Sequence, residues 1–164
     1  MKILVTAASR HRATEDIAAA IARVLHLRGL EADHLAPDEV QDLAAYDAVV
    51  LGSGIYAGRW LGNATSFVRR FAAQLNERPV WLFSSGPVGH PPTPKDAPAV
   101  DSIIEQTSAL EHKVFSGRLD KQDLGLLERT MVNAVRAPEG DYRDWVEIGR
   151  WAAEIADTLS PARR

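Results

Sequence analysis

The sequence contains no cysteine among its 164 residues. Disulfide bonds, thiolate nucleophiles, cysteine-ligated zinc and iron–sulfur clusters are therefore excluded together. Any redox chemistry in this chain would have to be carried by an organic cofactor. The five histidines are scattered without metal-ligand spacing, so we expect no metal site.

Strong net charge and long apolar runs are absent as well. A formal net charge of -3 is too small to favour a nucleic-acid partner. No apolar run approaches the roughly 20 residues that span a bilayer. The N-terminus, Met1–Thr6, reaches polar residues too early for a signal peptide. We expect a cytoplasmic protein without a transmembrane segment, and peripheral membrane contact stays open.

Short apolar runs alternate with amphipathic stretches along the whole chain, which we interpret as a single domain over residues 1–164. This alternation predicts a parallel sheet covered by helices on both faces, with right-handed crossovers. The strands are expected at 2–6, 30–35, 48–51, 79–83 and 113–116. The helices are expected at 14–27, 40–43, 60–75, 100–108, 121–135 and 145–159.

Three loops rich in glycine, serine and other small residues follow strands of this pattern, at 7–13, 52–60 and 84–95. In an open parallel sheet the ligand lies beyond the carboxyl ends of the strands, where the strand order reverses. All three loops are expected at that end. Their shared location predicts a binding site there.

The first loop, Ser9–Thr14, lies between a strand and the start of a helix. Free N–H groups and the positive end of the helix dipole favour an anion at such a place. Ser9 and Thr14 can add hydroxyl donors, and Arg10, His11 and Arg12 can add cationic donors. The pattern predicts a phosphate site; the alternative is a solvated basic turn that caps the helix.

The spacing of Ser9 and Thr14 resembles the flavodoxin family, whose first loop reads Ser/Thr-x-Thr-Gly-x-Thr around the phosphate of FMN. His11 stands where the family usually has threonine, and Arg12 where it has glycine. The resemblance covers nearly the whole chain. It implies a three-layer flavodoxin-like α/β sandwich with a five-stranded parallel sheet in the order 2-1-3-4-5.

The resemblance also implies which residues hold the cofactor FMN. From the three loops these are Ser9, Arg10, His11, Arg12, Ala13 and Thr14; Ser53, Gly54, Ile55, Tyr56, Ala57, Gly58 and Trp60; and Ser84, Ser85, Gly86, Pro87, Val88 and Gly89. Tyr56 is favoured as the aromatic beside the flavin ring. Trp60 is the second candidate, although it could equally be the first apolar anchor of the following helix. No catalytic residue is identified.

Within the family, the chain is most similar to the group that includes menaquinone-dependent protoporphyrinogen oxidase. The similarity rests on Ser9-Arg10-His11, on the stretch 55–60, on the segment 121–135 and on Asp144-Trp145 before the last helix. It implies FMN-dependent removal of hydrogen from a tetrapyrrole precursor, with a quinone as electron acceptor.

Three alternatives stay open at this point. The chain could be an electron carrier with a redox protein as partner, although its weak acidity argues against a classical carrier. It could be a flavodoxin-fold binding module that has lost FMN, which the replacement of glycine by Arg12 would support. It could also be an NAD(P)H-using quinone reductase, for which no nicotinamide motif is recognisable. The sequence gives no electron donor, no acceptor and no oligomeric state.

The segment 121–135 is longer than a short flavodoxin requires. As an amphipathic helix it could dock on a membrane, a partner or an apolar substrate. The alternative, which we favour, is that it packs on its own domain.

Overall fold

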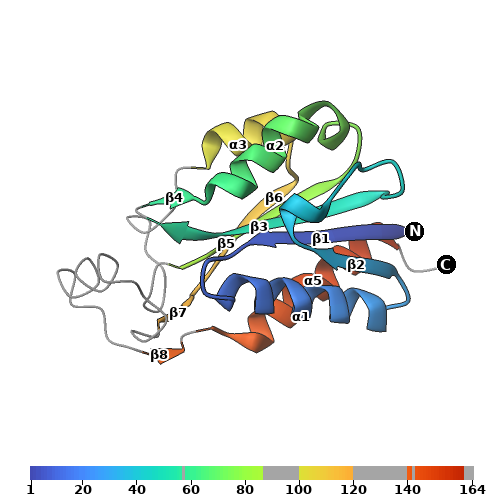
Figure 1. Ribbon diagram of the computed structural model, residues 1–164. Coiled ribbons are helices and arrows are strands. Elements are labelled where there is room, and N and C mark those ends of the chain that lie inside the picture. The colour runs from blue at the N-terminus through green and yellow to red at the C-terminus, as the bar shows by residue number, and fades with distance from the viewer. Residues whose placement is uncertain (57, 87–99, 120–139, 142, 161–164) are drawn as a thin grey trace.

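A parallel β-sheet with helices on both faces forms the centre of the molecule (Figure 1). The computed structural model describes residues 1–56, 58–86, 100–119, 140–141 and 143–160. Its elements are β1 (Lys2–Ala8), α1 (Ala13–Leu27), β2 (Glu31–Leu35), the 3-10 helix η1 (Pro37–Glu39), β3 (Ala48–Tyr56), β4 (Arg59–Trp60), α2 (Gly62–Leu75), β5 (Val80–Ser85), α3 (Asp101–Thr107), β6 (Glu111–Phe115), β7 (Arg118–Leu119), β8 (Gly140–Asp141) and α5 (Trp145–Leu159).

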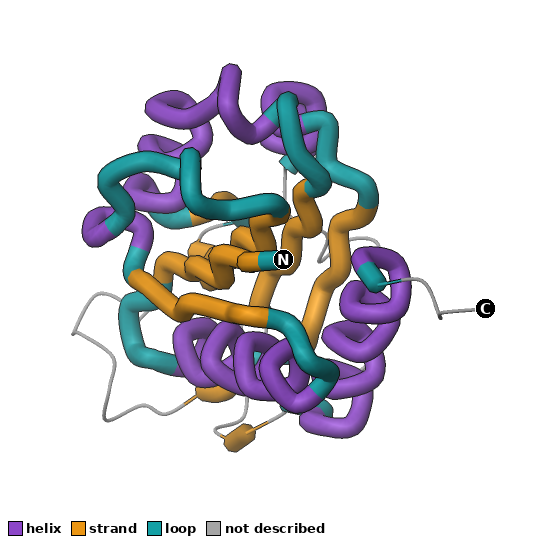
Figure 2. The backbone as a smooth tube through the Cα atoms, turned by 90° about the vertical axis from the view of Figure 1, so that its right-hand side faces the viewer, coloured by secondary structure: helices purple, strands orange, loops and turns teal. Residues whose placement is uncertain are grey.

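The main path of the sheet runs β2-β1-β3-β5-β6, and every pair along it is parallel. This is the predicted order 2-1-3-4-5, because β4 is only a short antiparallel strand paired with β3. Helices α1 and α5 cover one face, and α2 and α3 cover the other (Figures 1 and 2). The predicted flavodoxin-like three-layer architecture is confirmed.

Two apolar cores lie on opposite faces of the sheet, as the alternation of side chains along each strand requires. On β1, Ile3 and Val5 point into the core shared with α1 and α5, whereas Leu4 belongs to the core under α2 and α3. Strands covered on both faces need continuous apolar runs, which is why their positions could be predicted.

Aromatic side chains in the core between the sheet and helices α1 and α5 pack α5 against the sheet. The ring of Trp151 lies 6.1 Å from the ring of Phe83 and 5.5 Å from that of Phe115, centroid to centroid, with both pairs near edge-to-face. This packing fixes α5, whose predicted bounds at 145–159 are confirmed.

Strand β3 is longer than predicted. It continues through the glycine-rich stretch to Tyr56. The antiparallel strand β4 follows at Arg59–Trp60, so that α2 begins at Gly62 rather than at Trp60. Pairing on both sides holds this extension, with Ala8 opposite Ser53 on one side and Ser85 opposite Gly54 on the other.

The short helix predicted at 40–43 is wrong. A 3-10 turn forms earlier, at Pro37–Glu39, where proline fixes φ and the Glu39 carboxylate accepts from the Ala36 N–H at 2.9 Å. Val40 then adopts an extended conformation. The predicted helix at 121–135 lies outside the described residues. None of the helices in the described ranges is long and apolar enough to cross a lipid bilayer.

Candidate functional site

The first residues of the three glycine- and serine-rich loops meet at one edge of the sheet, on the left of Figure 1. Strands β1, β3 and β5 are neighbours, and their carboxyl ends lie side by side. The strand order reverses between β1 and β3, since the chain goes from β1 outward to β2 and later returns to the opposite side of β1. Binding sites of open α/β sheets are found at such a reversal.

The first turn of α1 presents backbone donors at this edge. The earliest helical hydrogen bond runs from the Asp16 N–H to the Arg12 carbonyl at 2.9 Å. No described residue accepts from the N–H groups of Ala13, Thr14 or Glu15. Unsatisfied N–H groups and the helix dipole make this turn suited to an anion.

The Thr14 side chain points into the same place. Thr14 is only 3% exposed, yet no described residue forms a hydrogen bond with its hydroxyl. The hydroxyl faces Gly54 at the end of β3, where a Cβ atom would lie 3.1 Å from Thr14 Oγ1. Glycine at position 54 therefore allows the close approach. A hydroxyl on a buried residue that bonds to none of the described residues, next to open N–H groups, fits the phosphate group of a cofactor.

Arg12 occupies the position just before α1 with φ 64° and ψ -10°, in the left-handed region. This conformation favours glycine, and the first-loop pattern of the flavodoxin family has glycine at this position. The chain thus keeps a left-handed residue at this point although its side chain is that of arginine. The Arg12 side chain is exposed.

Arg10 connects the first loop with the second. Its guanidinium carbon lies 4.0 Å from the centroid of the Tyr56 ring, in a cation–π contact. Tyr56 is half-buried at the end of β3, and His11 is half-buried beside Arg10 in the chain. The aromatic residue favoured from the sequence is therefore at the site, with an arginine against its ring.

Trp60 lies in the core rather than at the surface of the site. It is 6% exposed and packs with the apolar residues under α2. Its indole N–H donates to Ser84 Oγ at 2.8 Å, which ties the second loop to the third. Trp60 packs as an apolar anchor ahead of α2, and its assignment to the flavin ring stays a prediction.

Ser84 continues this contact to His112 on β6. Ser84 Oγ lies 2.8 Å from His112 Nε2, and with the indole donating to its oxygen the hydroxyl can donate its proton to a neutral imidazole. Burial lowers the pKa of His112 below its ordinary value of 6.5, against the opposing charge of Asp101. The chain Trp60–Ser84–His112 was missed from the sequence, because nothing in the spacing of these residues connects them.

The other candidate residues are placed as follows. Ser53 Oγ donates to the Gly54 carbonyl at 2.8 Å and accepts from the Leu61 N–H at 3.0 Å. Its hydroxyl therefore bonds to the residue directly before α2. Gly86, with φ 92°, donates its N–H to the Phe115 carbonyl at 2.9 Å. Ile55 is half-buried, whereas Ser85 is buried. Ala57, Pro87, Val88, Gly89 and the His90–Pro92 segment lie outside the described residues.

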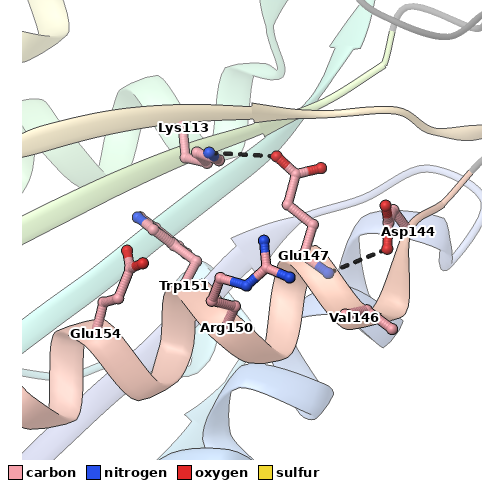
Figure 3. Close-up of a pocket in the computed structure, with 7 residues that line it drawn as sticks. All are labelled: Lys113, Asp144, Val146, Glu147, Arg150, Trp151 and Glu154. Atoms are coloured by element: carbon pink, nitrogen blue, oxygen red, sulfur yellow. Dashed lines mark hydrogen bonds and ion pairs between the residues drawn. The ribbon is translucent and has the colours of Figure 1, made fainter.

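A separate groove of about 260 Å³ lies between the edge strand β6 and α5 (Figure 3). It is lined by Lys113, Asp144, Val146, Glu147, Arg150, Trp151 and Glu154. Lys113 Nζ pairs with Glu147 Oε1 at 3.2 Å, and none of the residues that the sequence assigned to a cofactor lines the groove. In the described ranges no group of three or more histidine, aspartate or glutamate side chains is arranged to hold a metal ion.

Comparison with known proteins gives consistent results. Residues 4–145 match the family model of the flavodoxin domain. The chain is 26% identical to protoporphyrinogen IX dehydrogenase [quinone] of Escherichia coli (strain K12), over 95% of each chain.

Two solved structures are similar to the fold. Oxidised flavodoxin 1 from Bacillus cereus has a TM-score of 0.68 and 20% identity, over 98% of this chain and 100% of that chain. The rubredoxin oxygen:oxidoreductase of Desulfovibrio gigas has a TM-score of 0.65 and 13% identity, over 96% of this chain and 36% of that chain.

Proposed function

The chain belongs to the flavodoxin domain family, and we propose that it is an FMN-dependent oxidoreductase. The observation that carries the cofactor assignment is Thr14, an almost fully buried residue whose hydroxyl bonds to none of the described residues and lies beside the open N–H groups of α1. These donors sit where the strand order reverses, which is the place where the flavodoxin-like sheet holds FMN.

The phosphate of FMN would bind at Ser9–Thr14. The N–H groups of Ala13 and Thr14 and the hydroxyls of Ser9 and Thr14 act as donors. Arg12, exposed before the helix, adds a positive charge.

The ring would lie between the ends of β3 and β5. Tyr56, half-buried at the end of β3, would be the aromatic residue at its side. The third loop, 84–89, contains no aromatic residue that could cover the opposite face. An open face suits a bulky, flat substrate better than a protein partner that needs only the ring edge.

For the reaction, we propose removal of hydrogen from a protoporphyrinogen-like tetrapyrrole with a quinone as acceptor. The support is the 26% identity with the E. coli dehydrogenase, which extends over 95% of both chains. Bound FMN would supply the transfer of hydrogen from the substrate to the quinone. The residues of this chain would hold the cofactor, orient it and keep one face accessible.

Cofactor binding is tested by titrating the apo-protein with FMN and following the quenching of flavin fluorescence. Thr14→Ala should weaken binding by about 1 kcal/mol or more, because a hydroxyl donor to the phosphate is lost. Thr65→Ala is the matched control, since the Thr65 hydroxyl donates to the Gly62 carbonyl on the exposed side of α2. No FMN binding at tens of micromolar would favour a binding module without cofactor.

The reaction is tested by anaerobic mixing of the FMN-loaded protein with protoporphyrinogen. The flavin absorption band should bleach, and a menaquinone analogue should restore it. No bleaching, together with rapid electron exchange with a ferredoxin or its reductase, would overturn the enzyme proposal in favour of an electron carrier.

A further inference from the structure

Arg143, directly before α5, is a buried arginine that the proposed cofactor site does not use. Its side chain is 6% exposed. Nε and Nη2 donate to the two carboxylate oxygens of Asp141 at 2.9 and 2.7 Å. The guanidinium carbon lies 4.6 Å from the centroid of the Trp145 ring. A planar fork held on two sides in this way has little freedom to move.

The remaining arm of the guanidinium reaches the first turn of α1. Nη1 donates to the Ala13 carbonyl at 3.3 Å and to Asp16 Oδ2 at 3.2 Å. Ala13 carries one of the N–H groups that would bind the phosphate, and Asp16 makes the first hydrogen bond of the helix directly after them. One side chain therefore joins the segment before α5 to the turn that presents those donors, across 127 positions of sequence.

The charges around Arg143 argue against a direct role as a phosphate ligand. Two carboxylates, those of Asp141 and Asp16, already surround its one positive charge. The hydrogen bond with Asp141 is the largest contribution that raises the pKa of Arg143, so the guanidinium stays charged and paired. Its contacts fix positions instead of offering an open cation.

We propose that Arg143 is a positioning residue for the phosphate end of the cofactor site, holding the first turn of α1 through Ala13 and Asp16. The inference rests on the proposed function, because it assumes that this turn binds the phosphate of FMN. Small displacements of preorganised donors weaken binding strongly, so a clamp on this turn acts on affinity without touching the ligand.

The opposite end of the same two helices provides a matched control. Arg28, which follows α1, pairs with Asp157 near the end of α5. Helices α1 and α5 pack side by side along their length (Figure 1). Replacing Arg28 removes an arginine–aspartate link between the same elements, far from the proposed phosphate site. Any effect through loosening of the helix pair would appear in both variants.

The experiment compares the dissociation constants of FMN and riboflavin, which differ only by the phosphate, for the wild type, Arg143→Lys and Arg28→Lys. Arg143→Lys keeps the charge and loses the fork, and it should weaken FMN about tenfold or more. Riboflavin affinity should stay within about twofold of the wild type, because the ring site is not touched. Arg28→Lys should change neither constant.

Equal weakening of both flavins by Arg143→Lys, or no weakening of FMN, would overturn the inference. If Arg143→Lys does not fold, Asp141→Asn replaces it, because it disturbs the fork and leaves the arginine in place; the same FMN-only loss is expected. The double variant Arg143→Met/Asp16→Asn removes the arginine together with the charge of Asp16. If Arg143 acted only by neutralising Asp16, this variant would bind FMN as tightly as the wild type, and that result would overturn the positioning role. Failure of the wild type to bind FMN would instead refute the proposed function.

Discussion

Replacing Arg12 by glycine should stabilise the protein. Arg12 has φ 64° just before α1, a conformation in which a side chain with a Cβ atom costs about 1–2 kcal/mol. Glycine removes this strain but loses about 0.5–1 kcal/mol through its larger entropy in the unfolded chain. The free energy of unfolding should therefore rise by about 0.5–1 kcal/mol in Arg12→Gly, the net of these two effects.

The assay is urea denaturation of the apo-protein, followed by the fluorescence of its tryptophans. The midpoint should increase while the m-value stays constant, because the surface exposed on unfolding does not change. Arg12→Ala is the matched control, since alanine removes the charge and the long side chain but retains the Cβ atom. Its stability should stay close to that of the wild type.

The reasoning would be refuted by equal stability of Arg12→Gly and Arg12→Ala. In that case the left-handed conformation would cost nothing measurable, or the loop would relax to another path in the unliganded protein. An increase in both variants would point to the charge of Arg12 instead of its backbone.

Two further predictions concern the sheet and its flank. Gly52→Ala should lower the free energy of unfolding by about 1–3 kcal/mol, because the new Cβ would lie 2.2 Å from Phe83 Cζ. Gly149→Ala, in α5, should raise the free energy of unfolding by about 0.5–1 kcal/mol, because nothing lies within 4 Å of the new Cβ. Urea midpoints compare the two variants. The second prediction is that stability falls as the pH drops below about 6.5, because burial lowers the pKa of His112 in the folded state and the unfolded chain takes up the proton first. Urea midpoints between pH 8 and 5 should decline more steeply for the wild type than for His112→Gln, and parallel curves would contradict the assignment.

The layered fold could be predicted because its signals are local. Continuous apolar runs mark strands buried on both faces, and the alternation of strands with helices restricts the topology to a few arrangements. The resemblance in the first loop then selected the strand order. α5 was predicted with its correct bounds, since an amphipathic stretch follows Asp144, whose carboxylate caps the helix by accepting from the Glu147 N–H at 3.0 Å.

The extent of β3 could not be read from the sequence, because its last residues look like a loop. Gly52 and Gly54 have low strand propensity, yet both are required by neighbours that are distant in sequence. Gly52 leaves room for the Phe83 ring, and Gly54 leaves room for the Thr14 hydroxyl. Such requirements arise only after the sheet and α1 have assembled.

The position of the candidate site was predictable, but the contacts that organise it were not. Where the three loops meet follows from the strand order alone. The Arg143 fork, in contrast, joins residues 127 positions apart and leaves no periodic or compositional signal. The same is true of the indole of Trp60, whose burial and bond to Ser84 become visible only with the hairpin β3–β4 in place.

The charges at the first turn of α1 give Arg12, at a position that favours glycine, a role in the proposed FMN site. Glu15 and Asp16 place two carboxylates in this turn, where a phosphate would add further negative charge. Arg143 pairs with Asp16, and Arg10 lies against Tyr56. Arg12 is then an exposed cation next to the start of the helix, where the proposed site places the phosphate of FMN. Arg12→Gly should accordingly gain stability but bind FMN more weakly at low salt, and the loss should shrink at high ionic strength; tighter FMN binding would mean that Arg12 obstructs the site.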